Sequence, residues 1–278
     1  MARSNRRRVA AARRRVPGKG KTFGPKAPPK VAHLSKPLKA AINRVVHGNI
    51  ETKYVAQALQ RPDGGSILNA YTGFTSGITG TSEIYACLPV LSEGTAGHQR
   101  AGEYVNPVKA RVHLNIVSTQ NYLKNADIMV YAFFLEAIAV KDLAGYGNIP
   151  IQQLLDNGQG SVVTFDGTSV TSLYKVNTRA FRVIKVVKKR IITNVGGGLT
   201  TSLPPVAWDH TLNHHAVTVN IPVPKRLGYA SDGSLYPVNH APFMVLGFVD
   251  NGYHGDTAPG ITESVLVEGR SELWYKDA

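Results

Sequence analysis

The chain has 278 residues, 43% of them hydrophobic and 18% charged, and a formal net charge of +14 at pH 7. This composition is typical of a globular protein, and neither a signal-peptide pattern nor a run of 18 apolar residues is present, so we expect a soluble protein without a membrane span. The single cysteine, Cys87, excludes an internal disulfide and any site built from several cysteines.

The excess positive charge lies wholly in the first fifty residues. Residues 1–50 hold 14 of the 32 Lys and Arg and no Asp or Glu, whereas residues 51–278 hold 18 of each sign. A protein that binds nucleic acid through its folded surface would instead spread its cations over strands and helices. We therefore predict a basic segment over residues 1–50, comprising an arm, a linker and a short helix, and a neutral domain over residues 51–278.

The arm begins with two arginine triplets, residues 6–8 and 13–15, separated by Val and Ala. Blocks of like charge repel each other, and so few large apolar groups cannot offset the entropy lost on ordering, so we predict that the arm is disordered when free. Residues 17–30 are rich in Pro and Gly interleaved with Lys, which is typical of a linker.

A short amphipathic helix is predicted after the linker. Ser35 can cap it, Leu38, Ile42 and Val45 recur on one face, and Gly48 can end it. The helix could pack this apolar face on the edge of the domain, or it could also lay its basic face on phosphate.

From Glu51 onward the pattern changes to the two-residue period of strands, separated by turn dipeptides such as Asp63-Gly64. We expect about eight strands, near residues 51–60, 82–90, 108–118, 127–140, 161–165 or 170–176, 180–192, 214–223 and 243–250, with 263–276 as the last. Residues 128–140 are apolar enough for a central strand buried on both faces, and only residues 149–155 have a helical pattern within the domain. Long connections favour strands that cross between two sheets, so we predict an all-β fold: a single eight-stranded antiparallel jelly-roll sandwich with a disordered basic N-terminal arm. Residues 63–81, 91–107, 196–212 and 227–242 are candidate outer loops.

No set of residues predicts catalysis, a metal site or a cofactor. The densest group of ligand-type residues is Asp209, His210, His214 and His215, but neighbouring residues on a strand point to opposite faces, so we expect a polar strand and loop there. Cys87 lies in an apolar run and is predicted to be a core thiol. We therefore expect that the protein is not an enzyme.

Phosphate binding is predicted for the basic segment and for one strand of the domain. Residues 181–194 interleave cations with apolar residues, and in a regular strand Arg182, Lys188 and Arg190 would share one face, with Lys185 and Lys189 on the other. This strand could carry solvated cations only, or a cationic inner surface. The predicted nucleic-acid-binding residues are Arg3, Arg6, Arg7, Arg8, Arg13, Arg14, Arg15, Lys19, Lys21, Lys26, Lys30, Lys36, Lys39, Arg44, Arg182, Lys188 and Arg190.

Three further segments carry a resemblance to a known family: residues 49–54 (NIETKY), 177–184 (NTRAFRVI) and 269–277 (GRSELWYKD). With the two arginine triplets, they make the chain similar to the capsid proteins of circular Rep-encoding single-stranded DNA viruses, the circovirus-like viruses. The resemblance implies a single jelly roll, self-assembly into an icosahedral shell, a luminal arm that holds the genome, and an arm that doubles as a nuclear localisation signal for a host import receptor.

We therefore expect a viral coat protein that packages single-stranded nucleic acid, with circular single-stranded DNA implied by the resemblance. It would be found in the virion and, during assembly, in the host nucleus. The alternative is a cellular nucleic-acid-binding protein or a structural subunit of a ribonucleoprotein with a basic tail. Phosphate contacts are alike in DNA and RNA, so the residues themselves leave the type of nucleic acid open.

Overall fold

The computed structural model describes residues 35–38, 41, 42, 45, 51–68, 72–73, 77–78, 80–118, 126–193, 214–231, 233–250 and 265–277. The chain divides into two units, Met1–His47 and Gly48–Ala278. In the first unit, residues 36–38, 41, 42 and 45 are helical, as the spacing predicted. Leu38, Ile42 and Val45 on the apolar side of this helix are exposed. The predicted disordered arm lies outside the described residues.

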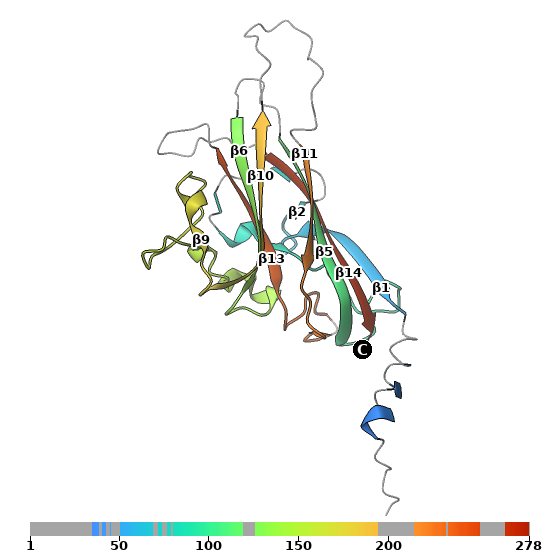
Figure 1. The fold of residues 1–278 in the computed structure, drawn as a ribbon. Coiled ribbons are helices and arrows are strands. Elements are labelled where there is room, and N and C mark those ends of the chain that lie inside the picture. Colours follow the sequence, from blue (N-terminus) through green and yellow to red (C-terminus); the bar gives the residue numbers. More distant parts are fainter. Residues whose placement is uncertain are drawn as a thin grey trace, which may run out of the picture. The chain divides into compact units, whose positions relative to one another are not determined.

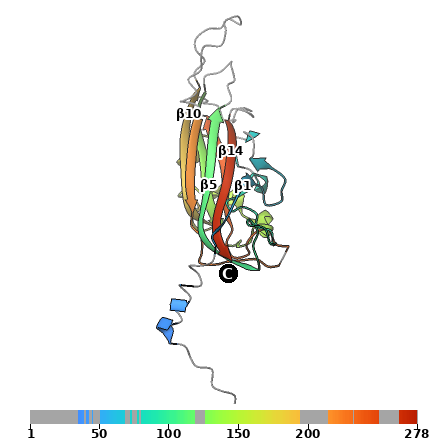
Figure 2. The ribbon, with the colours of Figure 1, turned by 90° about the vertical axis from the view of Figure 1, so that its right-hand side faces the viewer.

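One sheet of the second unit is built around two long strands, β5 (Tyr104–Ser118) and β14 (Val265–Asp277). Its order is β11 (His214–Ile221), β5, β14, β1 (Lys53–Gln60) and β2 (Ile67–Leu68), with β12 (Leu227–Gly228) paired to β5 and β3 (Thr72–Gly73) paired to β14. All of these pairings are antiparallel. Figure 2 shows β5, β14 and β1 side by side.

The other main sheet has the order β10 (Phe181–Thr193), β6 (Ala126–Ala137), β13 (Pro242–Asp250) and β4 (Tyr85–Ala86), and it is also antiparallel. β6 was predicted as a strand buried on both faces, and its residues 131–137 are all buried. The two sheets form separate layers in Figure 1.

The route of the chain between the sheets is that of a jelly roll. Counted in chain order, the eight main strands are β1, β4, β5, β6, β10, β11, β13 and β14, which gives the order 6-3-8-1 in one sheet and 5-4-7-2 in the other. Successive strands therefore alternate between the sheets, except for the neighbours β6 and β10. This confirms the predicted all-β jelly-roll sandwich.

A hydrophobic core lies between the two sheets. Val112 and Leu114 of β5 and Leu273 of β14 contribute from one sheet, and Phe134 of β6 and Leu246 of β13 contribute from the other. Cys87 belongs to the same core and is completely buried, as its apolar surroundings predicted. Burial raises the pKa of its thiol well above the ordinary value, and the charge of Glu136 adds to this effect.

A second core lies on the far face of the β6 sheet. There the ring of Phe165 packs against the rings of Tyr131 and Phe133, with centroid distances of 5.3 Å to Tyr131 and 5.6 Å to Phe133. Leu143 and Leu154 belong to the same core. These partners come from the 43 residues 138–180, which we call the insertion. The insertion covers this face of the sandwich and explains why β6 is apolar on both sides.

The insertion contains its own small sheet, in the order β8 (Val162–Val163), β7 (Leu155–Asp156) and β9 (Lys175–Val176). The strand predicted at 161–165 or 170–176 is thus present only as β8 and β9, outside the sandwich. Residues 149–155, predicted to be helical, form the short 3-10 helix η3 (Ile151–Gln153) and then enter β7. The described residues also form the 3-10 helices η1 (Thr81–Glu83), η2 (Leu143–Asn148) and η4 (Thr171–Leu173).

Candidate nucleic-acid interface

Few of the predicted phosphate-binding residues can be placed. All those before residue 35, together with Lys39 and Arg44, lie outside the described residues. Lys36 is exposed on the helix of the first unit. The remaining three, Arg182, Lys188 and Arg190, lie on β10.

The structure does not put these three β10 residues on one face, and this corrects the prediction. The pairing of β10 with β6 shifts between Val183 and Lys185, which marks a β-bulge. Arg182 is opposite Glu136, whereas Lys188 is opposite Tyr131. Side chains of residues directly opposite each other share a face, and Glu136 and Tyr131 are an odd number of residues apart on the regular strand β6. Arg182 therefore lies on the face of Lys189, and Lys188 and Arg190 lie on the other.

Arg182 is part of a polar cluster with the buried carboxylate of Glu136. Its Nη1 lies 3.4 Å from Glu136 Oε2, and His240 Nδ1 lies 2.9 Å from Oε1. The Nε2 of His240 lies 2.9 Å from the carbonyl oxygen of Pro222, which follows β11 in the opposite sheet. The hydrogen bond to His240 is the largest influence on the pKa of Glu136 and lowers it. Burial raises this pKa, and the charges of His240, Arg182 and Lys141 lower it further, so that it lies below the ordinary value. This cluster links the two sheets, and in it Arg182 already has an anionic partner.

Lys188 and Arg190 lie on an edge strand, because β10 is the last strand of its sheet. Lys188 Nζ is 5.0 Å from the ring centroid of Tyr131, and His215 Nε2 lies 2.9 Å from the backbone carbonyl of Arg190. Lysines and bulges on an edge strand prevent pairing with another sheet, so both features of β10 have an explanation that needs no nucleic acid.

A different surface, which the sequence analysis did not select, combines cations with aromatic rings. It is the face of the β11–β5–β14–β1 sheet that points away from the core, and we call it the open face. Its residues alternate with buried ones along β5 and β14, and most are polar or charged. Trp274 lies on it near the end of β14, with the Tyr54 ring at 5.0 Å, Lys109 Nζ at 5.3 Å and the Arg111 guanidinium at 5.8 Å.

Beside these rings, the Glu272 carboxylate has three polar neighbours. The hydroxyl of Tyr54 donates to Oε1 at 2.9 Å, His113 Nε2 lies 3.0 Å from Oε2, and Arg270 Nε lies 3.8 Å away. Burial opposes ionisation, but the hydrogen bonds from Tyr54 and His113 and the charges of His113 and Arg270 lower the pKa of Glu272 overall. Glu272 is therefore ionised and paired at neutral pH, and its charge is largely balanced within the open face.

The alternation Lys109, Arg111, His113 was visible in the sequence as the polar side of a strand. The sequence does not show that Trp274 and Tyr54 lie next to it. Those neighbours come from β14 and β1, which are separated from β5 by more than a hundred and by about fifty residues, respectively.

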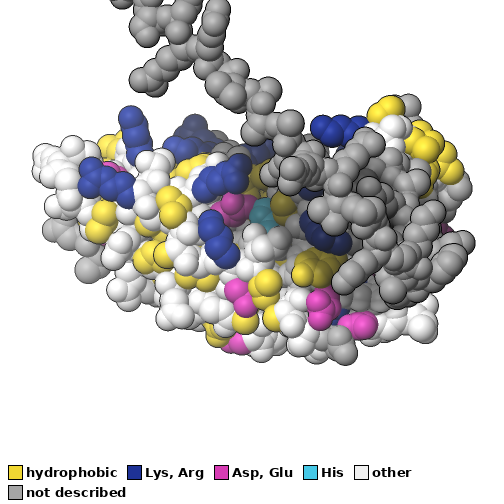
Figure 3. Space-filling model, turned by 90° about the horizontal axis from the view of Figure 1, so that it is seen from below, with side chains coloured by type: hydrophobic (Ala, Val, Ile, Leu, Met, Phe, Trp, Pro, Cys, Tyr) yellow, Lys and Arg dark blue, Asp and Glu magenta, His cyan; other side chains and the backbone are white. Residues whose placement is uncertain are grey.

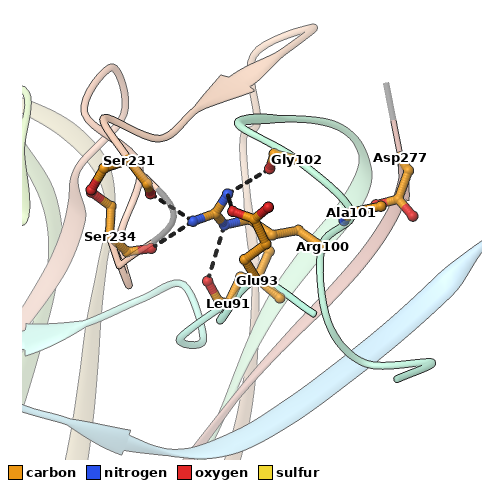
Figure 4. A network of polar contacts seen from close by, with 8 residues as sticks. All are labelled: Leu91, Glu93, Arg100, Ala101, Gly102, Ser231, Ser234 and Asp277. Atoms are coloured by element: carbon orange, nitrogen blue, oxygen red, sulfur yellow. Dashed lines mark hydrogen bonds and ion pairs between the residues drawn. The ribbon is translucent and has the colours of Figure 1, made fainter. Parts of the chain in front are cut away.

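The described parts of two predicted outer loops, around 91–107 and 227–242, are joined by Arg100. Its side chain is completely buried, and its guanidinium donates to the carbonyls of Leu91, Gly102, Ser231 and Ser234 and pairs with Glu93 at 3.2 Å (Figure 4). The ring of Tyr229 packs 4.5 Å from the guanidinium. This network gives the two loops a fixed relation to each other. The predicted loop at 196–212 lies outside the described residues.

Among the described residues that Figure 3 shows, the basic side chains do not form one continuous patch. They lie apart from one another, among hydrophobic and acidic ones. In the described part of the chain, no group of three or more His, Cys, Asp and Glu could hold a metal ion. Of the four sequence candidates for a metal site, Asp209 and His210 lie outside that part. Within the same ranges no helix is both long and apolar enough to cross a membrane.

No family model and no curated protein matches this chain. Among solved structures, the chain is similar to one from the structure of the Macrobrachium rosenbergii nodavirus, with 6% sequence identity and a TM-score of 0.32. The match covers 93% of this chain and 60% of the nodavirus chain.

Proposed function

We propose that this protein is a viral coat protein that assembles into a small icosahedral shell and packages single-stranded nucleic acid, circular DNA in our proposal, through its basic N-terminal segment. The protein is then structural and not an enzyme. The observation that supports this most is the combination of a jelly-roll domain with a charge distribution that puts the whole excess of cations in residues 1–50. Jelly rolls are a recurrent fold of viral capsids.

In this proposal the arm binds by electrostatics alone. Each arginine that neutralises a phosphate releases a condensed counterion, so binding depends steeply on salt and hardly on sequence. With 14 cations in each basic segment, a shell of about 60 copies would carry roughly 840 charges, which suits a genome on the order of a thousand nucleotides.

The domain supplies the rigid part of the shell. It carries no excess charge, so copies do not repel each other strongly, and the loops fixed by Arg100 are suited to contacts between subunits. Contacts of one surface with a different surface of the next copy close into a shell when the rotation between copies permits it.

Deletion of residues 1–30 tests the role of the arm. We expect the shortened protein to keep the circular-dichroism spectrum of a β protein and still to form particles, but to enclose little nucleic acid, as measured by the ratio of absorbance at 260 and 280 nm after nuclease treatment. A matched pair of full-length variants separates the effect of positive charge from the effect of the guanidinium group. Replacing both arginine triplets by Lys should preserve packaging, and replacing them by Gln should abolish most of it.

Packaging that is unchanged in both the deletion and the Gln variant would show that the arm does not hold the genome. A full-length protein that stays monomeric, or that joins a defined ribonucleoprotein, would favour the alternative of a cellular subunit. The same Gln variant tests the nuclear address: we expect a fluorescent fusion to lose its nuclear accumulation, whereas unchanged nuclear accumulation would reject that role.

A further inference from the structure

The open face carries two aromatic rings that are held next to each other by the register of two paired strands, β1 and β14. Tyr54 on β1 is directly opposite Trp274 on β14, and Trp274 is directly opposite Lys109 on β5. The two ring centroids are 5.0 Å apart, and the ring planes are inclined by 41°. Tyr54 is 41% exposed. The strand pairing fixes the positions of these two residues on the sheet surface.

Two cations lie over the ring of Trp274. Lys109 and Arg111 lie within 6 Å of the Trp274 ring, and the guanidinium of Arg111 also donates to the side chain of Asn220 at 3.2 Å. Across the described part of the open face, the charged residues of β5 and β14 are the cations Lys109, Arg111, Arg270 and Lys276 and the carboxylates Glu268 and Glu272. This surface is therefore net positive, although the domain as a whole is neutral.

We propose that Tyr54 and Trp274 form a stacking platform for the unpaired bases of a packaged single strand, with Lys109 and Arg111 contacting its phosphates. This inference rests on the proposed packaging function and gives it a specific surface on the folded domain. An aromatic ring can stack on any base, so the platform accepts many sequences. A duplex hides the faces of its bases, so the platform selects single strands, which the charge of the arm alone cannot do.

The test uses the intrinsic fluorescence of Trp274 in the full-length protein. The chain has two tryptophans, Trp208 and Trp274, so Trp208→Phe leaves Trp274 as the only one. We expect a 20-nucleotide oligothymidylate to quench this emission saturably, and a duplex of equal length to quench it much less. The titration is run at a salt concentration high enough to weaken binding through the arm, because stacking depends less on salt than phosphate contacts do.

Substitutions then separate stacking from other effects. With the arm intact, and with binding followed by the anisotropy of a labelled oligonucleotide because the Trp274 variants lack the fluorescence signal, Tyr54→Leu and Trp274→Leu should each weaken binding of the single strand about 5- to 100-fold and leave binding of the duplex unchanged. Trp274→Phe keeps an aromatic ring and should retain most of the affinity. Thermal melting of each variant identifies any that fail to fold, and the difference in Trp274 quenching between single strand and duplex remains the test if the Leu variants do so.

A second pair of variants tests the cations. Lys109→Ala with Arg111→Ala removes two charges from the open face, and Lys175→Ala with Arg179→Ala removes two charges from the insertion side of the sandwich. We expect only the first pair to weaken binding of the single strand. An equal loss in both pairs would show that only net charge matters and would overturn the platform.

The outcomes separate this inference from the proposed function. If the ring variants keep full selectivity for the single strand while packaging still depends on the arm, the platform is wrong and the coat function stands. If the ring variants instead lose particle assembly at unchanged affinity, the open face is a contact between copies. If the full-length protein binds no nucleic acid at all, the proposed function itself fails.

Discussion

Arg100 is a charged side chain in a place where burial is costly. Its guanidinium is fully removed from solvent, and it is satisfied by four carbonyl groups, the Glu93 carboxylate and the ring of Tyr229. A planar group with five donors fits such a set of acceptors, and a lysine with one ammonium group does not. The residue therefore stabilises a specific arrangement of two loops.

Arg100→Lys should consequently destabilise the domain by about 3–5 kcal/mol, because it leaves several buried acceptors unpaired. Urea unfolding followed by circular dichroism would measure the loss. Arg61→Lys is the matched control, since Arg61 pairs with Asp63 near the surface and should change stability by less than about 1 kcal/mol. Equal effects of the two substitutions would mean that the Arg100 network is not what holds the loops.

The Glu136 cluster gives stability that depends on pH. Because the folded protein lowers the pKa of Glu136 below its ordinary value of 4.5, the carboxylate contributes stability above that value and loses the contribution as the pH falls through the folded pKa. Glu136→Gln should therefore cost about 1–3 kcal/mol at pH 7, and the difference from the unsubstituted protein should shrink as the pH falls through the lowered pKa of Glu136. Urea titrations at pH 7 and pH 3.5 measure it. A difference that is constant over this range would contradict the assignment.

At the scale of elements, strand periodicity predicted most of the sandwich. The alternation in residues 108–118 and 214–223 identified β5 and β11, and the apolar run at 128–140 identified β6 as a strand buried on both faces. The sequence could not show what covers β6, because the covering residues, such as Phe165, lie in an insertion without a strong periodic pattern. A strand was predicted near residues 82–90, but within this range only the two residues of β4 form a strand.

The placement of cations on β10 failed for a local reason. A single bulge between Val183 and Lys185 moves Arg182 to the other face, and nothing in the composition of this segment indicates where the extra residue is placed. The candidate surface on the open face was missed for a different reason. Its residues come from three strands that are distant in the sequence, and a one-dimensional pattern does not show which strands become neighbours.

Gly269 shows how closely β14 packs against the core. A Cβ at this position would lie 2.5 Å from Leu59 Cδ1 and 3.1 Å from Leu114 Cδ2. Gly269→Ala should therefore destabilise the domain by about 1–3 kcal/mol through overpacking. Adding Leu59→Val, which removes the nearest methyl group, should recover part of this loss in thermal or urea unfolding. Stability unchanged by Gly269→Ala would show that β14 is more loosely packed than described.

The chain has two chemically different parts. A cationic segment without a single acidic residue precedes a neutral jelly roll, and within that domain one sheet is covered by the insertion while the other presents the open face. The charge partition was evident in the sequence. The difference between a covered and an open sheet became evident only when the path of the insertion was known.

We propose that the neutral domain assembles with copies of itself around a polyanion bound by the arm. Analytical ultracentrifugation of the purified full-length protein, with negative-stain microscopy of the same fractions, tests it most directly. We expect closed particles of megadalton mass that protect nucleic acid from added nuclease. Sedimentation as a 30.0-kDa monomer in every assembly buffer, with or without added single-stranded nucleic acid, would contradict the claim.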